Sequence, residues 1–266
     1  MSSSKDSLQD RFSRDQSLIE LKSDSELSKL RKAGQAAATI LKTLSRHLAP
    51  GVSTGRIDDI AFKEISSLGM KPAFLGYRGF PASICISINS ELVHGIPRTD
   101  RMIKEGDIVS IDMGVVSDGF YGDVAATYPV GKISKEAQRL LDITRESLEC
   151  AITQVKPENR LGDVSWAVQQ FAEKAGYSIV REYVGHGIGR KLHEEPPVPN
   201  FGKPRTGPRL LPGMVIAIEP MVNEGDWRVK QLSDGWTVVT QDGKLCAHFE
   251  HMVAVTKTGN EVLTRI

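Results

Sequence analysis

The sequence predicts an α+β domain of two related halves, with antiparallel strands backed by helices. The first observation is an internal repeat: the segments 105–112 and 212–219 each contain a turn glycine, a mostly apolar strand and a carboxylate at the same position. The second is a His-Gly-Ile triplet that begins at His94 and again at His186. The third is the order of elements, because each half consists of two helices followed by strands. One half used twice would bring carboxylates from both halves to a shared seam, on a sheet face that the helices leave free.

The composition is that of an ordinary globular protein. Of the 266 residues, 40% are hydrophobic and 25% are charged, which suits one large domain. The net charge of +1 gives no electrostatic reason to expect a nucleic acid or an anionic membrane as main partner. No apolar run approaches the roughly 20 residues needed to cross a bilayer. Three cysteines without a close pair fit neither a disulfide framework nor a structural zinc motif, so we expect a reducing, cytoplasmic compartment.

The N-terminal segment differs in composition from the rest. Residues 1–20 are rich in serine and lack an apolar core, which argues against a secretory signal, and their aspartates argue against a transit peptide. We therefore expect a flexible, solvated tail over 1–22 and a single folded domain over 23–266.

Capping and breaking residues predict the elements of the first half. Ser23 and Glu26 have capping-box spacing and apolar residues follow at helical intervals, so a helix begins there and stops at 50–51. A second helix begins after Ser53 or Thr54 and ends at Gly69. Strands are expected over 83–88, 108–116 and 120–130, the last two joined by a hairpin turn at 117–119.

The second half repeats this order. Helices are expected over about 134–155 and 161–175. Strands are expected near 177–180, 215–221, 237–240 and 246–255. Both halves would then present a sheet with a face open to polar side chains.

Two aspartates flank the hairpin. Asp112 and Asp123 are eleven positions apart, so we expect them nearly opposite each other on one face, with β-carbons about 5 Å apart. Two like charges so close are unfavourable unless a cation lies between them. For this pair alone, surface aspartates beside a turn are an equally good interpretation.

Two glutamates favour the cation. Glu219 ends the apolar run 215–218, and Glu250 lies in the apolar strand 247–255. Burying an unpaired charge costs on the order of several kcal/mol. No arginine or lysine lies between Met214 and Asp226 to pair with Glu219. A salt bridge with a distant partner stays open as the alternative for each.

The histidines add a nitrogen ligand. His186 stands among three glycines, whose backbone can approach a bound group closely; an exposed histidine on a flexible loop is the alternative. His193 precedes a proline segment, and His94 repeats the arrangement in the first half. His248 shares the strand face of Glu250 and would lie just behind the site, whereas His251 points to the opposite face.

Four carboxylates and one imidazole make an oxygen-rich set with room for two divalent ions. Such ligands suit Co, Mn, Fe(II) or Zn better than metals that prefer thiolates. Paired metals about 3.5–4 Å apart activate a bridging water and hold the attacking and leaving groups of a hydrolysis.

The segment 185–196, Gly-His-Gly-Ile-Gly-Arg-Lys-Leu-His-Glu-Glu-Pro, resembles the type I methionine aminopeptidases of the bacterial and organelle kind. The resemblance runs from about Ser25 to Ile266 and includes the motifs at 76–81, 89–97, 111–114, 234–237 and 250–251. Only thirty-two residues separate His186 from Glu219, which leaves no room for the long insert of type II relatives.

The resemblance implies the pita-bread fold, in which 23–266 is a single catalytic domain, and a dinuclear metal site. Its metal ligands would be Asp112, Asp123, His186, Glu219 and Glu250. In family terms Asp112 chelates one ion, Asp123 and Glu250 bridge, and His186 and Glu219 complete the other. Glu219 would also shuttle the proton, while His94 and His193 would contact the scissile amide and its carbonyl oxygen. A monovalent cation is often held by backbone carbonyls near Asn89, Glu91 and Cys246.

The resemblance also implies a pocket for an unbranched thioether, lined by Tyr77, Phe80, Cys85 and Trp236. Phe74 stands where a cysteine is frequent and Leu192 where a phenylalanine is frequent, so we expect altered inhibitor preference rather than a new substrate. Cys246-Ala247-His248 replaces a more usual Ser-Ala-Gln.

The implied activity is removal of the initiator methionine from nascent chains when the next residue is small, by metal-activated water. We expect N-terminal methionyl peptides as partners, transient contact with the ribosome and a monomeric enzyme. A dipeptidase or proline-directed aminopeptidase on the same fold is one alternative, although those relatives usually carry an additional N-terminal domain. A metal-free binding protein that kept the fold is another, against which the retained ligands and outer histidines argue.

Overall fold

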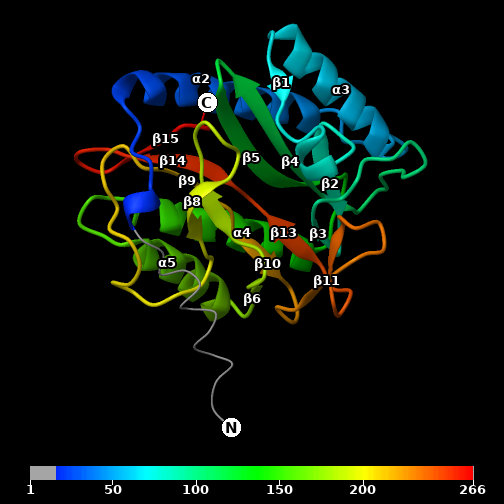
Figure 1. Cartoon of the computed structure of the whole chain (residues 1–266). Helices are drawn as coiled ribbons and strands as arrows, with labels where there is room; N and C mark the ends of the chain where they lie inside the picture. Colours follow the sequence, from blue (N-terminus) through cyan, green and yellow to red (C-terminus); the bar gives the residue numbers. More distant parts are fainter. Residues whose placement is uncertain (1–15, 266) are drawn as a thin grey trace.

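The computed structural model describes residues 16–265, and Figure 1 shows two pairs of helices on opposite sides of the strands. Helices α2 (Asp24–Ser45) and α3 (Thr54–Ser67) belong to the first half, and α4 (Lys135–Ile152) and α5 (Leu161–Lys174) to the second. Two short 3-10 turns, η1 (Gln16–Leu18) and η2 (Tyr77–Gly79), lie outside these helices. No helix in the described range 16–265 is both long and apolar enough to span a membrane.

The helix starts follow from their caps. At α2 the Ser23 side chain accepts the Glu26 N–H, and the Glu26 carboxylate accepts the Ser23 N–H, so the predicted capping box is confirmed. The helix ends at Ser45 rather than at the Pro-Gly pair, because Arg46 N–H donates to Thr43 and His47 N–H to Leu44, which tightens the last turn. Ser134 caps α4 with its side chain alone, which accepts the Ala137 N–H.

The first-half sheet is built around the hairpin of β4 (Ile108–Ser117) and β5 (Phe120–Pro129). Its two-residue turn has positive φ at both Asp118 (51°) and Gly119 (76°), the twist that suits a tight hairpin. Strands β1 (Lys71–Pro72) and β2 (Ile84–Ile88) pair with the other edge of β4. Helices α2 and α3 contribute to one apolar core with these strands.

The second-half sheet has the order β15-β14-β9-β7-β8, all antiparallel. Its strands are β7 (Gly185–Gly187), β8 (Glu194–Val198), β9 (Val215–Ile218), β14 (His251–Val255) and β15 (Asn260–Val262). Helices α4 and α5 share a second core with it. Two small sheets complete the fold, formed by β3 (Glu91–Val93), β11 (Val229–Gln231) and β12 (Val238–Thr240), and by β6 (Ser178–Ile179), β10 (Met221–Asn223) and β13 (Cys246–His248).

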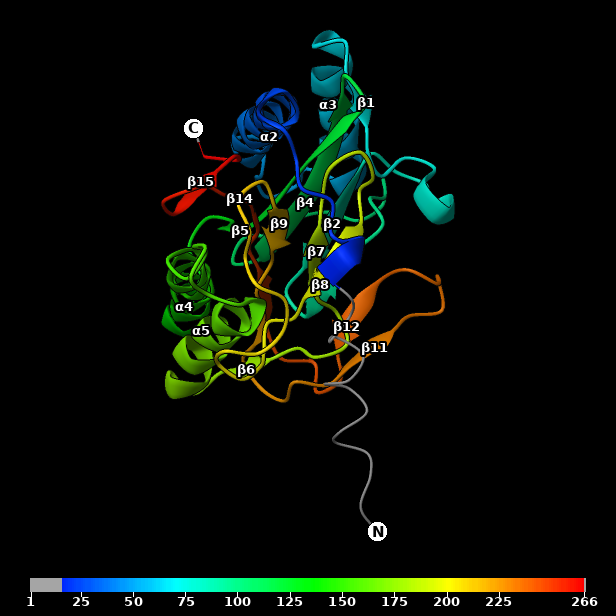
Figure 2. The same ribbon diagram turned by 60° about the vertical axis from the view of Figure 1, so that its left-hand side comes forward.

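The internal repeat predicted from the sequence is present. Gly106 (φ 88°) and Gly213 (φ 93°) make equivalent turns before β4 and β9, which pair with β5 and β14 respectively. The predicted fold class, an α+β fold with antiparallel strands and two related halves, is therefore confirmed. Figure 2, turned by 60°, shows α2 and α3 beside the first-half strands and α4 and α5 on the other side of the molecule.

The two halves are joined where β5 runs beside β13 and Glu250. Glu250 N–H donates to the Ala125 carbonyl at 2.8 Å. The Thr127 hydroxyl donates to the His248 carbonyl (2.9 Å), accepts the His248 N–H (2.9 Å) and lies 2.8 Å from the Ser110 hydroxyl. Thr127 thus uses its one donor and both lone pairs, and it fixes the second-half strand against the hairpin.

Three expectations differ from the structure. Ser117 pairs with Phe120, so Asp112 lies opposite Ala125 and Asp123 opposite Gly114; the aspartates share a face but are diagonal, not directly opposed. The predicted strands 215–221 and 246–255 are each broken, the first at 219–220 and the second at 249–250. The Phe249 N–H bonds to the Pro220 carbonyl and the Glu250 N–H to the Ala125 carbonyl, so neither strand continues as one ladder.

The third difference concerns the tail expected over 1–22, of which 1–15 lies outside the described residues. Lys22 is buried: its N–H donates to Gly213 and its ammonium lies 2.6 Å from Glu194. The packed part of the chain therefore includes Lys22. A partner 172 positions away gives no local sequence signal.

Replacing Thr127 with valine tests the junction between the halves. The change keeps the shape but leaves a buried N–H and a buried carbonyl of His248 without partners, so we expect the free energy of unfolding to fall by about 1–3 kcal/mol. Chemical denaturation measures it. Thr43→Val is the matched control, since that hydroxyl only bonds back to Thr39 within α2. Equal stability losses for the two variants would contradict the inferred role of Thr127.

Candidate active site

A cavity of about 280 Å³ lies at the seam between the two halves. Every residue predicted for the site lines it: Phe74, Tyr77, Phe80, Cys85, His94, Asp112, Asp123, His186, Leu192, His193, Glu219, Trp236 and Glu250. Sequence reasoning missed two further lining residues, Arg78 and Tyr183. Arg78 lies inside the 76–81 motif and has a positive φ (49°), a conformation that the residue type does not reveal; Tyr183 had no signal.

The repeat places one carboxylate of each half on equivalent strands. Asp112 lies on β4, and Glu219 directly follows β9. Asp123 lies on β5, and Glu250 directly precedes β14. The strand pairs β4–β5 and β9–β14 therefore each supply two carboxylates to the cavity.

Glycines around His186 serve the packing of strands. His186 is 7% exposed and lies on β7, so the alternative of an exposed histidine on a flexible loop is wrong. A β-carbon on Gly187 would lie 2.1 Å from the Glu195 carbonyl oxygen, and one on Gly185 would lie 2.3 Å from that of Ala217. Only glycine lets β7 fit this closely between β8 and β9.

His186 faces the carboxylates through Nε2. Its Nδ1 lies 2.9 Å from the Gly187 carbonyl, which can only accept, so Nδ1 carries the proton. Nε2 lies 3.8 Å from Asp123 Oδ2 and 3.6 Å from Glu219 Oε1. This tautomer leaves the Nε2 lone pair free to bind a metal ion.

Asp123 and Glu250 are buried, Asp112 and Glu219 are half-buried, and the four carboxylates lack lysine or arginine partners among the described residues. Within the described part of the chain, no lysine or arginine forms an ion pair with Asp112, Asp123, Glu219 or Glu250; the ion-pair contacts are to histidines. Burial raises the pKa of Asp112 and of Glu219 to about 7. Burial, and then the neighbouring carboxylates, hold the pKa values of Asp123 and Glu250 well above their usual range.

This donor set fits a divalent cation. Asp123, His186 and Glu250 each offer a ligand atom, and these atoms lie within 4.8 Å of one another. Asp123 Oδ1 and Glu250 Oε1 are buried without a hydrogen-bond partner among residues 16–265, although buried polar atoms are normally paired. A bound cation would satisfy both oxygens and remove the repulsion that raises the pKa values.

Two more histidines line the cavity as neutral rings. Burial lowers the pKa of His193 to about 3 and that of His94 to about 4. His193 Nδ1 lies 2.7 Å from the Tyr77 hydroxyl, and its ring centroid is 4.2 Å from that of His186. His94 packs edge-on against Tyr183.

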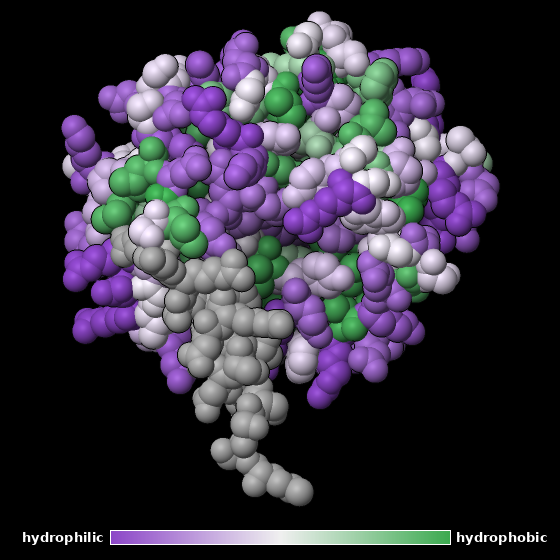
Figure 3. Space-filling view, viewed as in Figure 1, coloured by the Kyte–Doolittle hydropathy of each residue, from purple (hydrophilic) through white to green (hydrophobic). Residues whose placement is uncertain are grey.

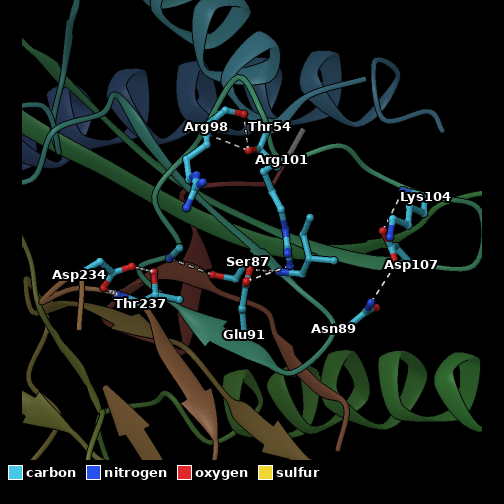
Figure 4. A network of polar contacts seen from close by, with 12 residues as sticks. Thr54, Ser87, Asn89, Glu91, Arg98, Arg101, Lys104, Asp107, Asp234 and Thr237 are labelled. Atoms are coloured by element: carbon cyan, nitrogen blue, oxygen red, sulfur yellow. Dashed lines mark hydrogen bonds and ion pairs between the residues drawn. The ribbon is translucent and has the colours of Figure 1, made fainter. Parts of the chain in front are cut away.

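The loop that carries His94 is held by the polar network of Figure 4. The Thr54 hydroxyl binds both the N–H and the carbonyl of Arg98, and the Ser87 hydroxyl accepts the Gly95 N–H. Arg101 donates to Glu91 at 3.0 Å. These contacts attach the loop to α3, β2 and β3, which lets His94 keep its positive φ of 59°.

Apolar and aromatic side chains form another wall. Phe80 and Trp236 pack edge to face with ring centroids 5.1 Å apart. Burial holds the pKa of Cys85 well above its usual range, so this residue remains a neutral thiol. Phe74 packs over β4, because a β-carbon on Gly114 would lie 3.0 Å from its ring. The cavity thus joins a carboxylate–histidine centre to an apolar recess.

The molecular surface in Figure 3 is mostly hydrophilic, with small separate hydrophobic groups outside the area that grey atoms cover. The exposed hydrophobic side chains of the described residues come from separate elements, such as Phe62 of α3 and Trp166 of α5. In the seam cavity, by contrast, apolar and ionisable side chains line one space.

Comparisons with known proteins agree with this architecture. Residues 28–257 match the metallopeptidase family M24. Methionine aminopeptidase 1 of Bacillus subtilis (strain 168) is 52% identical over 249 residues, which are 94% of this chain and 100% of the relative. Methionine aminopeptidase of Escherichia coli (strain K12) is 45% identical over 247 residues, which are 92% of this chain and 94% of the relative.

Solved structures show the same likeness. The crystal structure of methionine aminopeptidase from Thermotoga maritima superposes with a TM-score of 0.92 at 48% identity and covers 93% of this chain and 100% of that one. Prolidase from Pyrococcus furiosus, at a TM-score of 0.76 and 21% identity over 98% of this chain and 68% of that one, shares the fold alone. The chain belongs to the methionine aminopeptidases of metallopeptidase family M24 and has their pita-bread fold.

Proposed function

We propose that this enzyme removes N-terminal methionine from peptides whose second residue is small, with two divalent metal ions in the seam cavity. The observation that carries the proposal is the joining of a cation-seeking carboxylate–histidine centre to an apolar recess in one cavity. The relatives named methionine aminopeptidases support the substrate.

The residues that would hold the ions are Asp112, Asp123, His186, Glu219 and Glu250. The buried oxygens of Asp123 and Glu250 that lack a hydrogen-bond partner among the described residues support this ligand set. Bound divalent ions lower the pKa of a water and polarise a carbonyl, and Co, Mn, Fe(II) and Zn suit this donor set.

Glu219 is our candidate for the proton carrier. Its side chain is 14% exposed, so it reaches the cavity, and Oε1 and Oε2 lie 3.6 Å from His186 and His248. A carboxylate placed beside the bond that breaks can take a proton from the attacking water and give it to the leaving amine. His94 would contact the nitrogen of the bond that breaks.

His193 is our candidate for the oxyanion donor. If the Tyr77 hydroxyl donates to Nδ1, the single proton of the neutral ring sits on Nε2. That N–H would donate to the carbonyl oxygen as negative charge develops there.

The apolar recess would hold the methionine side chain. Phe74, Tyr77, Phe80, Cys85, Leu192 and Trp236 supply its walls. Sulfur beside aromatic edges is favourable by about 0.3–1.5 kcal/mol, which supports a thioether as occupant.

We further infer a monomeric, cytoplasmic enzyme that acts on nascent chains and touches the ribosome transiently. A monovalent cation near Asn89, Glu91 and Cys246 is also part of the proposal. It is supported by the backbone there, where the Asn89 carbonyl already accepts the Cys246 N–H at 3.0 Å and brings the two segments together.

Peptide cleavage with defined metals tests the function. Chelated protein given each divalent ion in turn should cleave Met-Gly peptides but neither Met-Val nor Leu-Gly peptides, as measured by release of the free amino acid. His186→Ala should abolish turnover, because it removes a ligand of the centre. Cleavage of Leu-Gly would favour a broader dipeptidase, and no cleavage with any ion would favour a binding protein.

Tyr77→Phe tests the oxyanion donor. The change removes the hydrogen bond that fixes the His193 tautomer, so we expect kcat to fall about tenfold with KM little changed. Steady-state kinetics measure both constants. Tyr177→Phe, outside the cavity, is the control and should behave as the parent enzyme. A loss confined to KM would instead place Tyr77 only in substrate binding.

The pH dependence of metal stabilisation tests the ligand set. Without metal, burial raises the pKa of Asp112 and Glu219 to about 7, above the unfolded values of about 4. The folded state then binds more protons, so this contribution to the stability of metal-free protein falls as the pH rises through this window. Ions bind the deprotonated carboxylates, so their stabilisation grows over the same window.

We therefore expect the rise in Tm on adding a divalent ion to be larger at about pH 7.5 than at about pH 5.5. Thermal unfolding with and without ion measures it, and Asp112→Asn should show a smaller rise at both pH values. An equal rise at both pH values in the parent protein would show that the ion binds elsewhere.

A further inference from the structure

His248 is a buried histidine that the proposed mechanism does not use. It is 1% exposed, and neither ring nitrogen has a hydrogen-bond partner within the described residues. Buried polar atoms are normally paired, and an unpaired one destabilises the fold. A histidine buried at this position therefore needs a physical explanation.

The surroundings of the ring point to Glu219. His248 Nε2 lies 3.6 Å from Glu219 Oε2. Asp112 and His94 also lie within electrostatic range of the His248 ring. His248 itself does not line the seam cavity, so it contacts Glu219 from behind and has no access to the peptide substrate.

The backbone of His248 is fixed from two sides. The Thr127 hydroxyl binds both its N–H and its carbonyl, and Met221 lies directly opposite on β10. Met221 is two residues after Glu219, so the pairing of β10 with β13 sets the distance between the His248 ring and the Glu219 carboxylate. The sheet therefore fixes the position of the His248 ring.

The chemistry of the two groups defines the contact. The imidazole ring of His248 carries at least one N–H donor. A carboxylate only accepts, so the proton must be on Nε2 for the two groups to bond. The distance of 3.6 Å between Nε2 and Glu219 Oε2 is longer than a hydrogen bond, and such contacts often tighten only when substrate binds.

We propose that His248 is a positioning residue, whose Nε2–H donates to Glu219 and fixes the direction of the carboxylate that carries the proton. The inference rests on the proposed role of Glu219 in the proposed function. It predicts that the effect of His248 on turnover depends on the Glu219 carboxylate.

A double-mutant cycle on the metal-loaded enzyme tests this dependence. His248→Leu, which keeps an apolar volume but no donor, should lower kcat on a Met-Gly peptide about 10- to 100-fold with little change in KM. The same change made in Glu219→Gln enzyme should cost far less, because the carboxylate it orients is gone. His248→Gln should restore most of kcat, since its amide can donate to Glu219. Equal losses in both backgrounds, or no rescue by glutamine, would overturn the proposal.

The control variant separates positioning from damage to the fold. His251→Leu removes a half-buried histidine from the adjoining strand, where its Nδ1 lies 2.8 Å from the Thr264 hydroxyl. It should lower Tm, and any loss of kcat should be the same in both Glu219 backgrounds. The same selective, Glu219-dependent loss for His251→Leu would refute a specific role of His248.

A spectroscopic measurement decides the contact independently of activity. In metal-loaded protein with ¹⁵N-labelled histidine, the resonance lost in His248→Gln should show a proton on Nε2 and should shift in Glu219→Gln. A proton on Nδ1, or an Nε2 bound to the metal, would refute the bond. If the parent enzyme cleaved no peptide with any ion, the proposed function would fail while this measurement still decided the His248–Glu219 contact.

Discussion

The structure depends on one electrostatic constraint: two buried and two half-buried carboxylates meet at a single seam without a lysine or arginine partner among the described residues. Desolvation raises the pKa values of all four, and repulsion by neighbouring carboxylates adds to the rise at Asp112, Asp123 and Glu250, so the arrangement opposes folding unless a cation compensates it. Strands, caps and junctions must therefore hold these side chains against their own repulsion. The M24 metallopeptidase membership agrees with this reasoning, because metal use is what makes such a cluster stable.

The repeated half explains how the repulsion is distributed. Each half supplies two carboxylates from neighbouring antiparallel strands, so neither half contains the whole cluster. The cluster forms only when β5 meets β13 and Glu250, at a junction made of backbone and hydroxyl hydrogen bonds rather than charges. Neutral bonds suit this place, since a further charge would perturb the carboxylates nearby. The histidines are divided between the halves as well: His94 comes from the first, His186 and His193 from the second.

Local features could be predicted from the sequence, and register could not. The capping box at Ser23, the hairpin at 118–119 and the repeat have local causes and are present. The diagonal placement of Asp112 and Asp123 across the hairpin depends on which two residues form its turn. An error of one residue in the position of the turn shifts the partner of each strand residue by two positions. Strand β7 was missed because glycines disfavour strands in general; here the close approach of β8 and β9 requires them. The break at Glu250 follows from contacts with Pro220 and Ala125, far away in the sequence.

The fold alone does not decide the substrate, because a prolidase shares it at 21% identity. The apolar wall of the cavity must supply the discrimination, and we expect two residues there, Phe74 and Leu192, to depart from the pattern more usual in methionine aminopeptidases. A phenylalanine in place of a cysteine adds more volume than a leucine in place of a phenylalanine removes. Both residues line the same cavity and belong to the same buried cluster, so the two changes together would narrow the recess and move its boundary. Because both residues are apolar, the expected result is the same unbranched side chain held against a differently shaped wall.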